Sequence, residues 1–519
     1  MPNYTNSVWS ETTPAPNYPA LAGNVTVDVA IVGGGITGIT AALLLQREGR
    51  RVAVVEARRI GKGETDKSTA HLTEALDVHY HTLISRFGVD GARLAAAGQR
   101  EAIERIALFA DELSEPCDFR RVPGFLFAET SADIDELAAE EAAVRKLGLA
   151  VTTTTEVPLP FPIARALRFD NQATIQPRSY LQGLAEMFAH AGGRIFEETQ
   201  VVDVDEGEPC RVITERGVVM AREVIVAAHV PVSNRVLLHT KLAAYRTYAV
   251  GVELPDGTAF DPGLFWDLAQ PYHYIRGHVV GGRNYLIVGG EDHKVGESAD
   301  TTAPFQRLER YVRDRFRRDV AATDYRWSGQ IVQSVDGLPY VGRNAMSSRV
   351  FVATGYAGNG ITNGTLAALV LTDEVAGRPS RYGALLDATR IKPLASARTF
   401  IQENVDFPKH LIGDRLPLPG AGALAMIPPG EGSVLSFGGK RLAVYRNGNG
   451  ELSALSPVCT HLGCLVHWNT TEKSWDCPCH GSRFDAHGRV LNGPALDPLQ
   501  RREIPVDEGP SGPQGGSRS

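Results

Sequence analysis

The chain has 519 residues, of which 43% are hydrophobic and 22% are charged, so it can bury large cores and has the length of roughly two to four domains. Its net charge is −7, and its lysines and arginines are scattered, which excludes the basic face that nucleic-acid binding requires; we expect no nucleic-acid partner. The first basic residue is Arg47, and the uncharged stretch before it holds four glycines, so we expect no signal peptide, no membrane span and a cytoplasmic protein.

A strand, a glycine-rich turn, a helix and a second strand are predicted near the N-terminus. Residues 27–32 form a β-branched run typical of a buried parallel strand, and residues 33–38 follow the pattern G-x-G-x-x-G. Residues 39–48 are rich in alanine and leucine and predict a helix, and residues 51–55 predict the second strand, which ends at Glu56. Dinucleotide-binding domains use this order of elements.

Dinucleotide binding explains the residue types at these positions. Gly33, Gly35 and Gly38 allow a tight turn and a close approach of the backbone, and the N-terminus of the helix faces a pyrophosphate. Glu56 is placed to bind ribose hydroxyls. These residues predict a dinucleotide site, and by themselves they leave open whether the ligand is FAD or NAD.

From here the sequence resembles the FAD-dependent D-amino-acid and glycine oxidase family, over approximately residues 22–390. Residues 199–202 resemble the family's strand whose backbone meets the adenine, and Val201 is the best match within it. Residues 224–228 resemble the strand that follows. The resemblance therefore implies that the dinucleotide is FAD.

A closing FAD element of the same family is matched by residues 336–361. Within it, Gly355, Gly358 and Gly360 form a turn that opens a helix from Thr362 onward. Unpaired N–H groups at such a turn can stabilise negative charge on the reduced flavin ring. We therefore add these three glycines to the candidate FAD-binding residues.

The resemblance implies an α/β FAD-binding domain, Rossmann-like and of the glutathione-reductase type, with an antiparallel substrate-domain sheet. Alternating apolar and polar runs between residues 231 and 330 predict that sheet, which in the family forms one wall of the substrate pocket. The pocket candidates are Tyr272, Tyr274, Arg276 and Arg246. The expected parts are an N-terminal extension (1–21), FAD-binding parts (22–90, 175–230 and 330–390) and substrate-domain parts (91–174 and 231–329).

Two positions in this domain depart from relatives of the family. His71 lies where some relatives attach FAD covalently, but its spacing from Glu56 is longer than theirs, so we expect noncovalent FAD. Glycine-oxidase-like relatives have Trp-x-Gly-Leu-Arg-Pro where this chain has residues 327–332, so Ile331 stands at the position of the arginine that clamps a substrate carboxylate. A carboxylate there would lack its partner, and we expect glycine and simple D-amino acids to be poor substrates unless Arg276, Arg246 or Lys294 replaces the clamp.

Residues 391–425 predict an interdomain linker, because they lack a long periodic segment and contain several prolines. Short strands separated by glycine-rich turns then predict a small all-β domain over residues 426–508, and residues 509–519 are expected to be a disordered tail. Four of the six cysteines fall within residues 459–479, which favours a metal site over a disulfide scaffold. Cys117 and Cys210 stand alone and are expected to be inert thiols.

Residues 459–464 and 477–482 resemble the two Rieske boxes. A Rieske centre takes two thiolates on one iron and two imidazoles on the other, and the proposed ligands are Cys459, His461, Cys477 and His480. Two cysteines and two histidines also suit tetrahedral zinc, but the full hexapeptides, with their glycine, proline and serine residues, favour the [2Fe–2S] cluster.

The Rieske resemblance implies further roles. Cys464 and Cys479 would form the disulfide of the high-potential branch, residues 492–495 would be the loop that covers the cluster, and Ser482 would donate to a bridging sulfide. Phe484 stands where respiratory Rieske proteins have a tyrosine, so one hydrogen bond that raises the potential is missing.

Together the two halves resemble bacterial fusions of a D-amino-acid-dehydrogenase-like flavoprotein with a Rieske domain. This implies oxidation of a small amine or alcohol by FAD, followed by single-electron transfer through the cluster to an external acceptor, a protein or a quinone-like molecule. One alternative is an electron-transfer or redox-sensing module without its own small-molecule substrate. Another is Rieske oxygenation, for which His273 and His278 have the H-x-x-x-x-H spacing but lack the expected acidic neighbours.

Overall fold

The computed structural model divides the chain into two compact units, Met1–Asn404 and Val405–Ser519, which we describe separately. The tail at 509–519 and most of the predicted linker lie outside the described residues. No helix among the described residues is long and apolar enough to cross a membrane. The structure describes residues 6–14, 16–231, 238, 240–255, 260, 262–298, 300–316, 323–391, 421–437 and 439–504.

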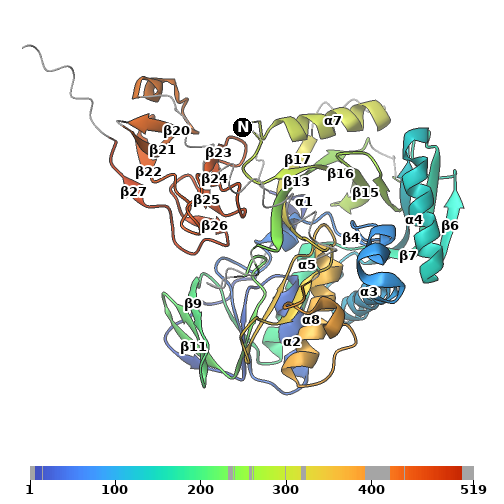
Figure 1. Ribbon diagram of the computed structural model, residues 1–519, viewed down its shortest axis with the longest axis horizontal. Helices are drawn as coiled ribbons and strands as arrows, with labels where there is room; N and C mark the ends of the chain where they lie inside the picture. The colour runs from blue at the N-terminus through green and yellow to red at the C-terminus, as the bar shows by residue number, and fades with distance from the viewer. Residues whose placement is uncertain are drawn as a thin grey trace, which may run out of the picture. The chain divides into compact units, whose positions relative to one another are not determined.

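A six-stranded sheet forms the FAD-binding part of the first unit (Figure 1). Its inner strands pair in parallel and are fully buried runs of valine, isoleucine and alanine, as expected for a sheet that is covered on both faces. The helices α2 (Ile36–Arg47), α5 (Pro177–His190) and α8 (Gly360–Val375) pack together, with α2 in contact with both others. In sheet order the strands are β18 (Tyr340–Arg343), β19 (Val350–Thr354), β12 (Glu223–Val226), β2 (Val29–Val32), β3 (Val52–Val55) and β8 (Arg194–Phe196).

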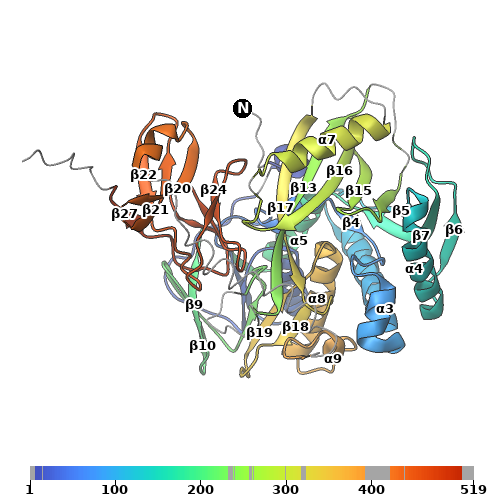
Figure 2. The ribbon, with the colours of Figure 1, turned by 45° about the horizontal axis from the view of Figure 1, so that its top comes forward.

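A nine-stranded, mainly antiparallel sheet confirms the predicted substrate-domain sheet. One of its faces is covered by α7 (Ala303–Phe316), which lies across β13 and β16 (Figure 2). The strands, in sheet order, are β17 (Thr323–Ser334), β13 (Leu242–Glu253), β16 (Arg283–Lys294), β15 (His273–Val280), β14 (Leu264–Asp267), β5 (Arg120–Ala128), β7 (Arg165–Thr174) and β4 (His71–Leu72), and β6 (Val151–Thr154) pairs with β7.

The remaining elements of the first unit complete its core. A four-stranded sheet has the order β1 (Val25–Thr26), β11 (Gly217–Ala221), β10 (Cys210–Thr214) and β9 (Val201–Asp205). The other helices are α3 (Tyr80–Glu112), α4 (Ile134–Leu147) and α9 (Gly383–Leu386), with short 3-10 turns η1 (Glu64–Lys67) and η2 (Ser131–Asp133).

The segment predicted as an N-terminal extension contributes to this core. Helix α1 (Val8–Thr12) has Ser7 as its N-cap and buries Trp9 completely against the substrate-domain sheet. The indole N–H of Trp9 donates to the Ser68 carbonyl at 2.7 Å, and the Ser10 hydroxyl donates to Asp66 at 2.9 Å. The segment therefore packs as an integral part of the first unit.

The second unit is all-β, as predicted. Its described strands form two four-stranded sheets. The first has the order β20 (Glu431–Phe437), β21 (Lys440–Arg446), β22 (Leu452–Leu455) and β27 (Arg501–Arg502), preceded by the turn η4 (Ala421–Met426). The second has the order β23 (His467–Asn469), β24 (Ser474–Asp476), β25 (Arg483–Asp485) and β26 (Val490–Asn492).

Candidate functional site

The glycine-rich turn after β2 leaves no room for side chains at two of its positions. Gly33 has a φ of +109°, and a Cβ atom added there would lie 2.5 Å from the Ala227 carbonyl oxygen. A Cβ atom added at Gly38 would lie 2.0 Å from the Gly33 carbonyl oxygen. Gly35 is the N-cap of α2 and provides no side-chain cap, and the N–H of Ile36 donates to the Thr65 hydroxyl at 3.2 Å. The N–H groups that follow in the first turn can serve a bound anion.

Glu56 lies directly after β3, at the edge of the sheet where this turn begins. Its carboxylate accepts the backbone N–H groups of Gly34 at 2.8 Å and Arg58 at 2.9 Å. The carboxylate is therefore held beside the turn by the backbone, and its contact with a ribose stays a prediction. Val201, the predicted adenine contact, is buried at the start of β9.

The closing glycine-rich turn lies between β19 and α8. Gly355 has a φ of +79°, and Gly360 is the first residue of α8. The N–H of Gly358 was expected to face the flavin, but in the structure it donates to the Asp77 carboxylate at 2.6 Å. The Asn359 side chain in turn accepts the N–H of Asp77 at 3.1 Å, so the turn is tied to the segment after β4.

Two observations fit a dinucleotide in this part of the molecule. The first is the side-chain-free cradle formed by Gly33 and Gly38. The second is His229, which follows β12: its Nε2 atom is buried and has no hydrogen-bond partner among the described residues. Burial lowers the pKa of this imidazole, so the ring is neutral and can accept or donate one hydrogen bond to a ligand.

The predicted pocket residues Tyr272 and Tyr274 lie together, Tyr272 directly before β15 and Tyr274 within it. Their ring centroids are 5.7 Å apart. The Tyr274 hydroxyl is hydrogen-bonded to the Thr247 hydroxyl at 2.8 Å, and the His71 ring lies edge-on to Tyr274 at 5.6 Å. Burial lowers the pKa of His71 to about 3, so this histidine is neutral beside the aromatic pair.

The predicted pocket arginines are held by the protein. Arg276 is fully buried, and its guanidinium donates to the backbone carbonyls of Thr69 at 3.0 Å, Ala70 at 2.9 Å and Ile175 at 3.2 Å. Arg246 is also buried and donates to the Ser328 hydroxyl on β17. These contacts give Arg276 a structural role, because its donors are used to fix the loop that leads into β4.

The two histidines with H-x-x-x-x-H spacing do not converge on one site. The His273 ring stacks on Tyr311 of α7 with centroids 4.1 Å apart, whereas the His278 ring packs against Trp9 of α1 at 4.7 Å. An odd separation along a strand places two side chains on opposite faces. This pair therefore cannot share a mononuclear iron.

Sequence reasoning missed two carboxylates in the same region, Asp77 and Asp292. Asp77 follows β4, and Asp292 lies near the end of β16 beside Tyr272 and Thr247. Asp77 is exposed, whereas Asp292 is half-buried and its desolvation raises the pKa of its carboxyl group to about 7. The signal that could have drawn attention to Asp292 is the change from the apolar residues 285–288 to the charged residues 291–294 within the one strand β16.

The two cysteine loops of the second unit have the same backbone hydrogen bonds. The N–H of Cys459 donates to the Cys464 carbonyl at 2.8 Å, and that of Cys477 donates to the Ser482 carbonyl at 2.8 Å. The N–H groups of Gly463 and Gly481, each with a positive φ, close the loops onto the carbonyls of Cys459 and Cys477. Two equivalent loops thus present one cysteine and one histidine each.

The side chains of these loops gather in the pairs that a Rieske cluster needs. The buried thiols of Cys459 and Cys477 are hydrogen-bonded to each other, which lowers the pKa of Cys459 to about 7 and raises that of Cys477. The rings of His461 and His480 lie 5.0 Å apart and are partly exposed. Two neighbouring sulfurs and two neighbouring imidazoles fit the two irons of the cluster.

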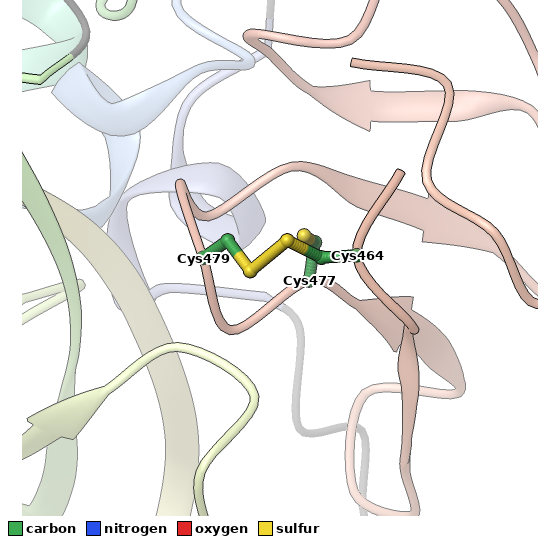
Figure 3. Close-up of side chains that lie close together, drawn as sticks. All are labelled: Cys464, Cys477 and Cys479. Carbon is green, nitrogen blue, oxygen red and sulfur yellow. A yellow bond between two sulfur atoms is a disulfide. The ribbon is translucent and has the colours of Figure 1, made fainter. Parts of the chain in front are cut away.

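Cys464 and Cys479 are joined by a disulfide that links the two loops. The Sγ atom of Cys477 lies within 4.8 Å of both disulfide sulfurs (Figure 3), and Cys477 is the only free thiol of the three. The Ser482 hydroxyl accepts the N–H of Ala495 at 3.0 Å, which ties the predicted covering loop to the second box. Phe484 is completely buried.

The two halves of the chain match two known families. Residues 28–374 match the FAD dependent oxidoreductase family, and residues 421–503 match the Rieske [2Fe-2S] domain. The chain therefore belongs to the FAD-dependent oxidoreductases and carries a C-terminal Rieske domain, so its cofactors are FAD and a [2Fe–2S] cluster. The Rieske match decides against zinc at the cysteine and histidine ligands.

Similar proteins support this assignment over the whole chain. The putative Rieske 2Fe-2S iron-sulfur protein YhfW of Bacillus subtilis is 32% identical over 96% of this chain and 97% of its own length. Gamma-glutamylputrescine oxidoreductase of Escherichia coli is 25% identical over 74% of this chain and 91% of its own length. The crystal structure of glycine oxidase from Geobacillus kaustophilus shares the fold of the first unit, with a TM-score of 0.61, 22% identity, and coverage of 71% of this chain and 99% of its own.

Proposed function

We propose that the protein oxidises the carbon–nitrogen bond of a small amine at its FAD-binding unit and passes the electrons through its Rieske domain to an external acceptor. The observation that carries this proposal is that one chain contains both a FAD-binding unit and the paired thiols and imidazoles of a one-electron carrier. The relative gamma-glutamylputrescine oxidoreductase, whose name states an amine substrate, supports the choice of a CH–NH donor.

The residues that would hold the two groups are those named above. Gly33, Gly35, Gly38 and Glu56 would bind the pyrophosphate and ribose of FAD, with Val201 at the adenine and the turn from Gly355 to Gly360 beside the flavin ring. The cluster ligands would be Cys459, His461, Cys477 and His480. When bound, FAD takes two electrons from a substrate carbon and releases them singly, and the cluster carries one electron at a time.

The burial of the cluster ligands supports a direction for the outgoing electrons. Both thiols are buried, whereas both imidazoles retain accessible surface. Because the imidazole side is the one that solvent reaches, an acceptor would approach the cluster there. A small protein or a quinone-like molecule fits such an accessible side.

Anaerobic reduction of the full chain by small amines tests the proposal. We expect an amine to bleach the flavin absorbance and to produce the electron-spin resonance signal of a reduced Rieske cluster. In the Cys459→Ser variant the amine should still bleach the flavin, but electron delivery to added cytochrome c should fall at least about tenfold. Reduction of the wild-type flavin by a protein donor alone, with no response to any amine or alcohol, would favour the electron-transfer module instead.

A further inference from the structure

Asp77 lies beside the closing glycine turn, and Asp292 lies near the end of β16. One oxygen of Asp77 accepts the N–H of Gly358 at 2.6 Å. Asp292 lies close enough to Asp77 for the charges to raise the pKa of its carboxyl group, together with burial. The Oδ1 atom of Asp292 is buried and has no hydrogen-bond partner among the described residues. An oxygen of this kind is costly unless a ligand satisfies it.

Aromatic and hydroxyl groups surround this carboxylate pair. Thr247 and Tyr272 lie beside Asp292 and favour its ionised form, but burial outweighs them and raises the pKa of the carboxyl group. Tyr274 lies beside Tyr272 and is hydrogen-bonded to Thr247. Faces of tyrosine rings attract cations, and ionised carboxylates do so more strongly.

Neither carboxylate forms an ion pair within the described part of the chain, and the charge of the nearby His79 only partly offsets the rise in the pKa of Asp77. None of the ion pairs formed there includes Asp77 or Asp292. The nearby Glu291 is the contrast, because it is paired with Arg307 of α7 and with His273. When they are ionised, Asp77 and Asp292 therefore provide negative charge that no ion pair of the described residues neutralises.

Elsewhere in the expected pocket, the buried Arg246 is held by the protein, because its guanidinium donates to the Ser328 hydroxyl. Ile331 stands where the relatives' arginine would bind a substrate carboxylate, and it pairs in register with Tyr245 of β13. Arg276 uses its guanidinium to hold backbone carbonyls. The site thus lacks the relatives' arginine at position 331, and the arginines that it retains are bonded to the protein.

We propose that Asp292, supported by Asp77, binds the ammonium group of the substrate beside Tyr272 and Tyr274, and that the substrate is an alkyl or aralkyl amine without a carboxylate next to the reacting carbon. This inference rests on the proposed function, because it names the substrate class of the same site. Asp292 also accepts the proton that the ammonium must lose before oxidation.

The chemistry balances in two steps. The substrate R–CH₂–NH₃⁺ transfers one proton from nitrogen to the Asp292 carboxylate and becomes R–CH₂–NH₂. One C–H bond then breaks, the C=N bond forms, and the hydrogen leaves with both bonding electrons to FAD, which gives R–CH=NH₂⁺. The groups that face Asp292 during the proton transfer are Asp77, Tyr272 and Tyr274. The charge of the adjacent Glu291 also acts on Asp292, but that carboxylate is paired with Arg307 and His273.

The test compares the anaerobic flavin reduction of wild type, Asp292→Asn, Asp77→Asn and Glu291→Gln by butylamine, benzylamine and glycine. Glu291→Gln is a matched control, because it removes the same charge from the adjacent residue, whose partners are His273 and Arg307. For the amines, we expect Asp292→Asn to lower the ratio of reduction rate to dissociation constant by about 10- to 100-fold, the effect of losing one charged hydrogen bond. Glu291→Gln should change it by less than about threefold.

Two further measurements distinguish cation binding by Asp292 from a purely structural role. They are the pH dependence of flavin reduction and the binding of a cation that cannot react. For amines, the ratio of flavin reduction rate to dissociation constant should rise as pH increases through about 7, where Asp292 ionises. This rise should disappear in Asp292→Asn. Benzyltrimethylammonium, which has no N–H group, should perturb the flavin spectrum of wild type and should bind Asp292→Asn at least about tenfold more weakly.

The outcomes separate this inference from the function on which it rests. If glycine reduces the wild-type flavin faster than the amines do, or if Asp292→Asn leaves amine reduction unchanged, the inference is wrong and the proposed oxidase chemistry stands. If no small molecule reduces the flavin, the proposed function fails. In that case the binding of benzyltrimethylammonium still decides the inference: binding that depends on Asp292 supports a cation site, and its absence overturns it.

Stability gives an independent readout on the same variant. The pKa of Asp292 in the folded chain, about 7, lies above the usual value of about 4 for an unfolded chain. A raised carboxyl pKa means that the folded state loses stability as pH rises from the lower value to the higher one. Asp292→Asn should therefore melt at a higher temperature than wild type above neutral pH while reducing more slowly with amines, and a lower melting temperature at that pH would count against the unneutralised charge.

Discussion

The rings of His461 and His480 lie with centroids 5.0 Å apart and planes nearly perpendicular, at 88°. The two residues come from separate loops, and each is positioned by the same backbone hydrogen bonds around its own cysteine. Because the loops are equivalent, the imidazoles meet on one side and the thiols of Cys459 and Cys477 meet on the other. The geometry of the cluster site is therefore set by the backbone of two short segments.

The Cys459→Ser variant should lose the cluster and keep the flavin, because the two groups are bound by units with separate cores. Iron and labile sulfide should fall from about two of each per chain to near zero, with the flavin content unchanged. Cys210→Ser is the matched control, since that thiol is buried in the first unit. Loss of the flavin along with the iron would contradict the independence of the two units.

Cys464→Ser should weaken the cluster without preventing its assembly. The disulfide to Cys479 links the two loops, whereas the four predicted ligands remain in this variant. We expect cluster loss on heating to be faster and to begin at a lower temperature, measured by the decay of the visible absorbance. Cluster loss as complete as in Cys477→Ser would mean that Cys464 is a ligand.

Arg276→Met should destabilise the first unit by about 2–4 kcal/mol, because it leaves three buried backbone carbonyls without their donor. Thermal unfolding of the full chain measures the effect. Glycine and D-alanine should reduce the flavin slowly in both wild type and variant, since this arginine binds backbone. Fast reduction by millimolar glycine in wild type that disappears in Arg276→Met would instead assign a carboxylate clamp to Arg276.

His273→Gln should lower the free energy of unfolding at acidic and neutral pH and leave it unchanged at alkaline pH. Burial disfavours the charged ring, but hydrogen bonds to Asp267 and Glu291 outweigh it and raise the pKa of His273 to about 9. A histidine pKa raised on folding contributes stability that is complete below its unfolded value of about 6.5 and is lost as pH rises through about 9. Chemical denaturation should therefore show a difference of about 1–3 kcal/mol near pH 6 that disappears above about pH 10, and a difference independent of pH would be evidence against the charged ring.

The parts of the molecule that sequence alone predicted are those whose chemistry lies within short segments. Gly38 must be a glycine because a Cβ atom there would meet the Gly33 carbonyl oxygen of the same turn, and the short pattern carries that requirement directly. The contact of Gly33 with Ala227 adds a requirement that no local pattern reports. The same holds for the cysteine loops, where each ligand pair is separated by one or two residues. The substrate-domain sheet was predicted because period-two alternation reports which residues share a face.

The carboxylate pair could not be predicted in this way. Asp77 follows a two-residue strand and Asp292 belongs to a strand far along the chain, and only the tertiary fold brings them together. For Arg276 the sequence misled in the other direction, because the alternating apolar and polar pattern predicted its side chain to line the substrate pocket. Its partners are backbone carbonyls of Thr69 and Ala70, and no sequence pattern reports that a side chain binds the main chain of a distant loop.

Helix α1 has a practical consequence for anyone who shortens or tags this protein. Trp9 fills the space between the nine-stranded sheet and the loop carrying Ser68, and it lies 5.6 Å from the Arg276 guanidinium. A truncated gene that starts at the first Rossmann strand, the natural choice from domain boundaries, would delete this indole and uncover apolar surface of Trp327 and Ile287. Such a product would be expected to express as aggregated, flavin-poor material, so purification handles are better attached after the Rieske domain.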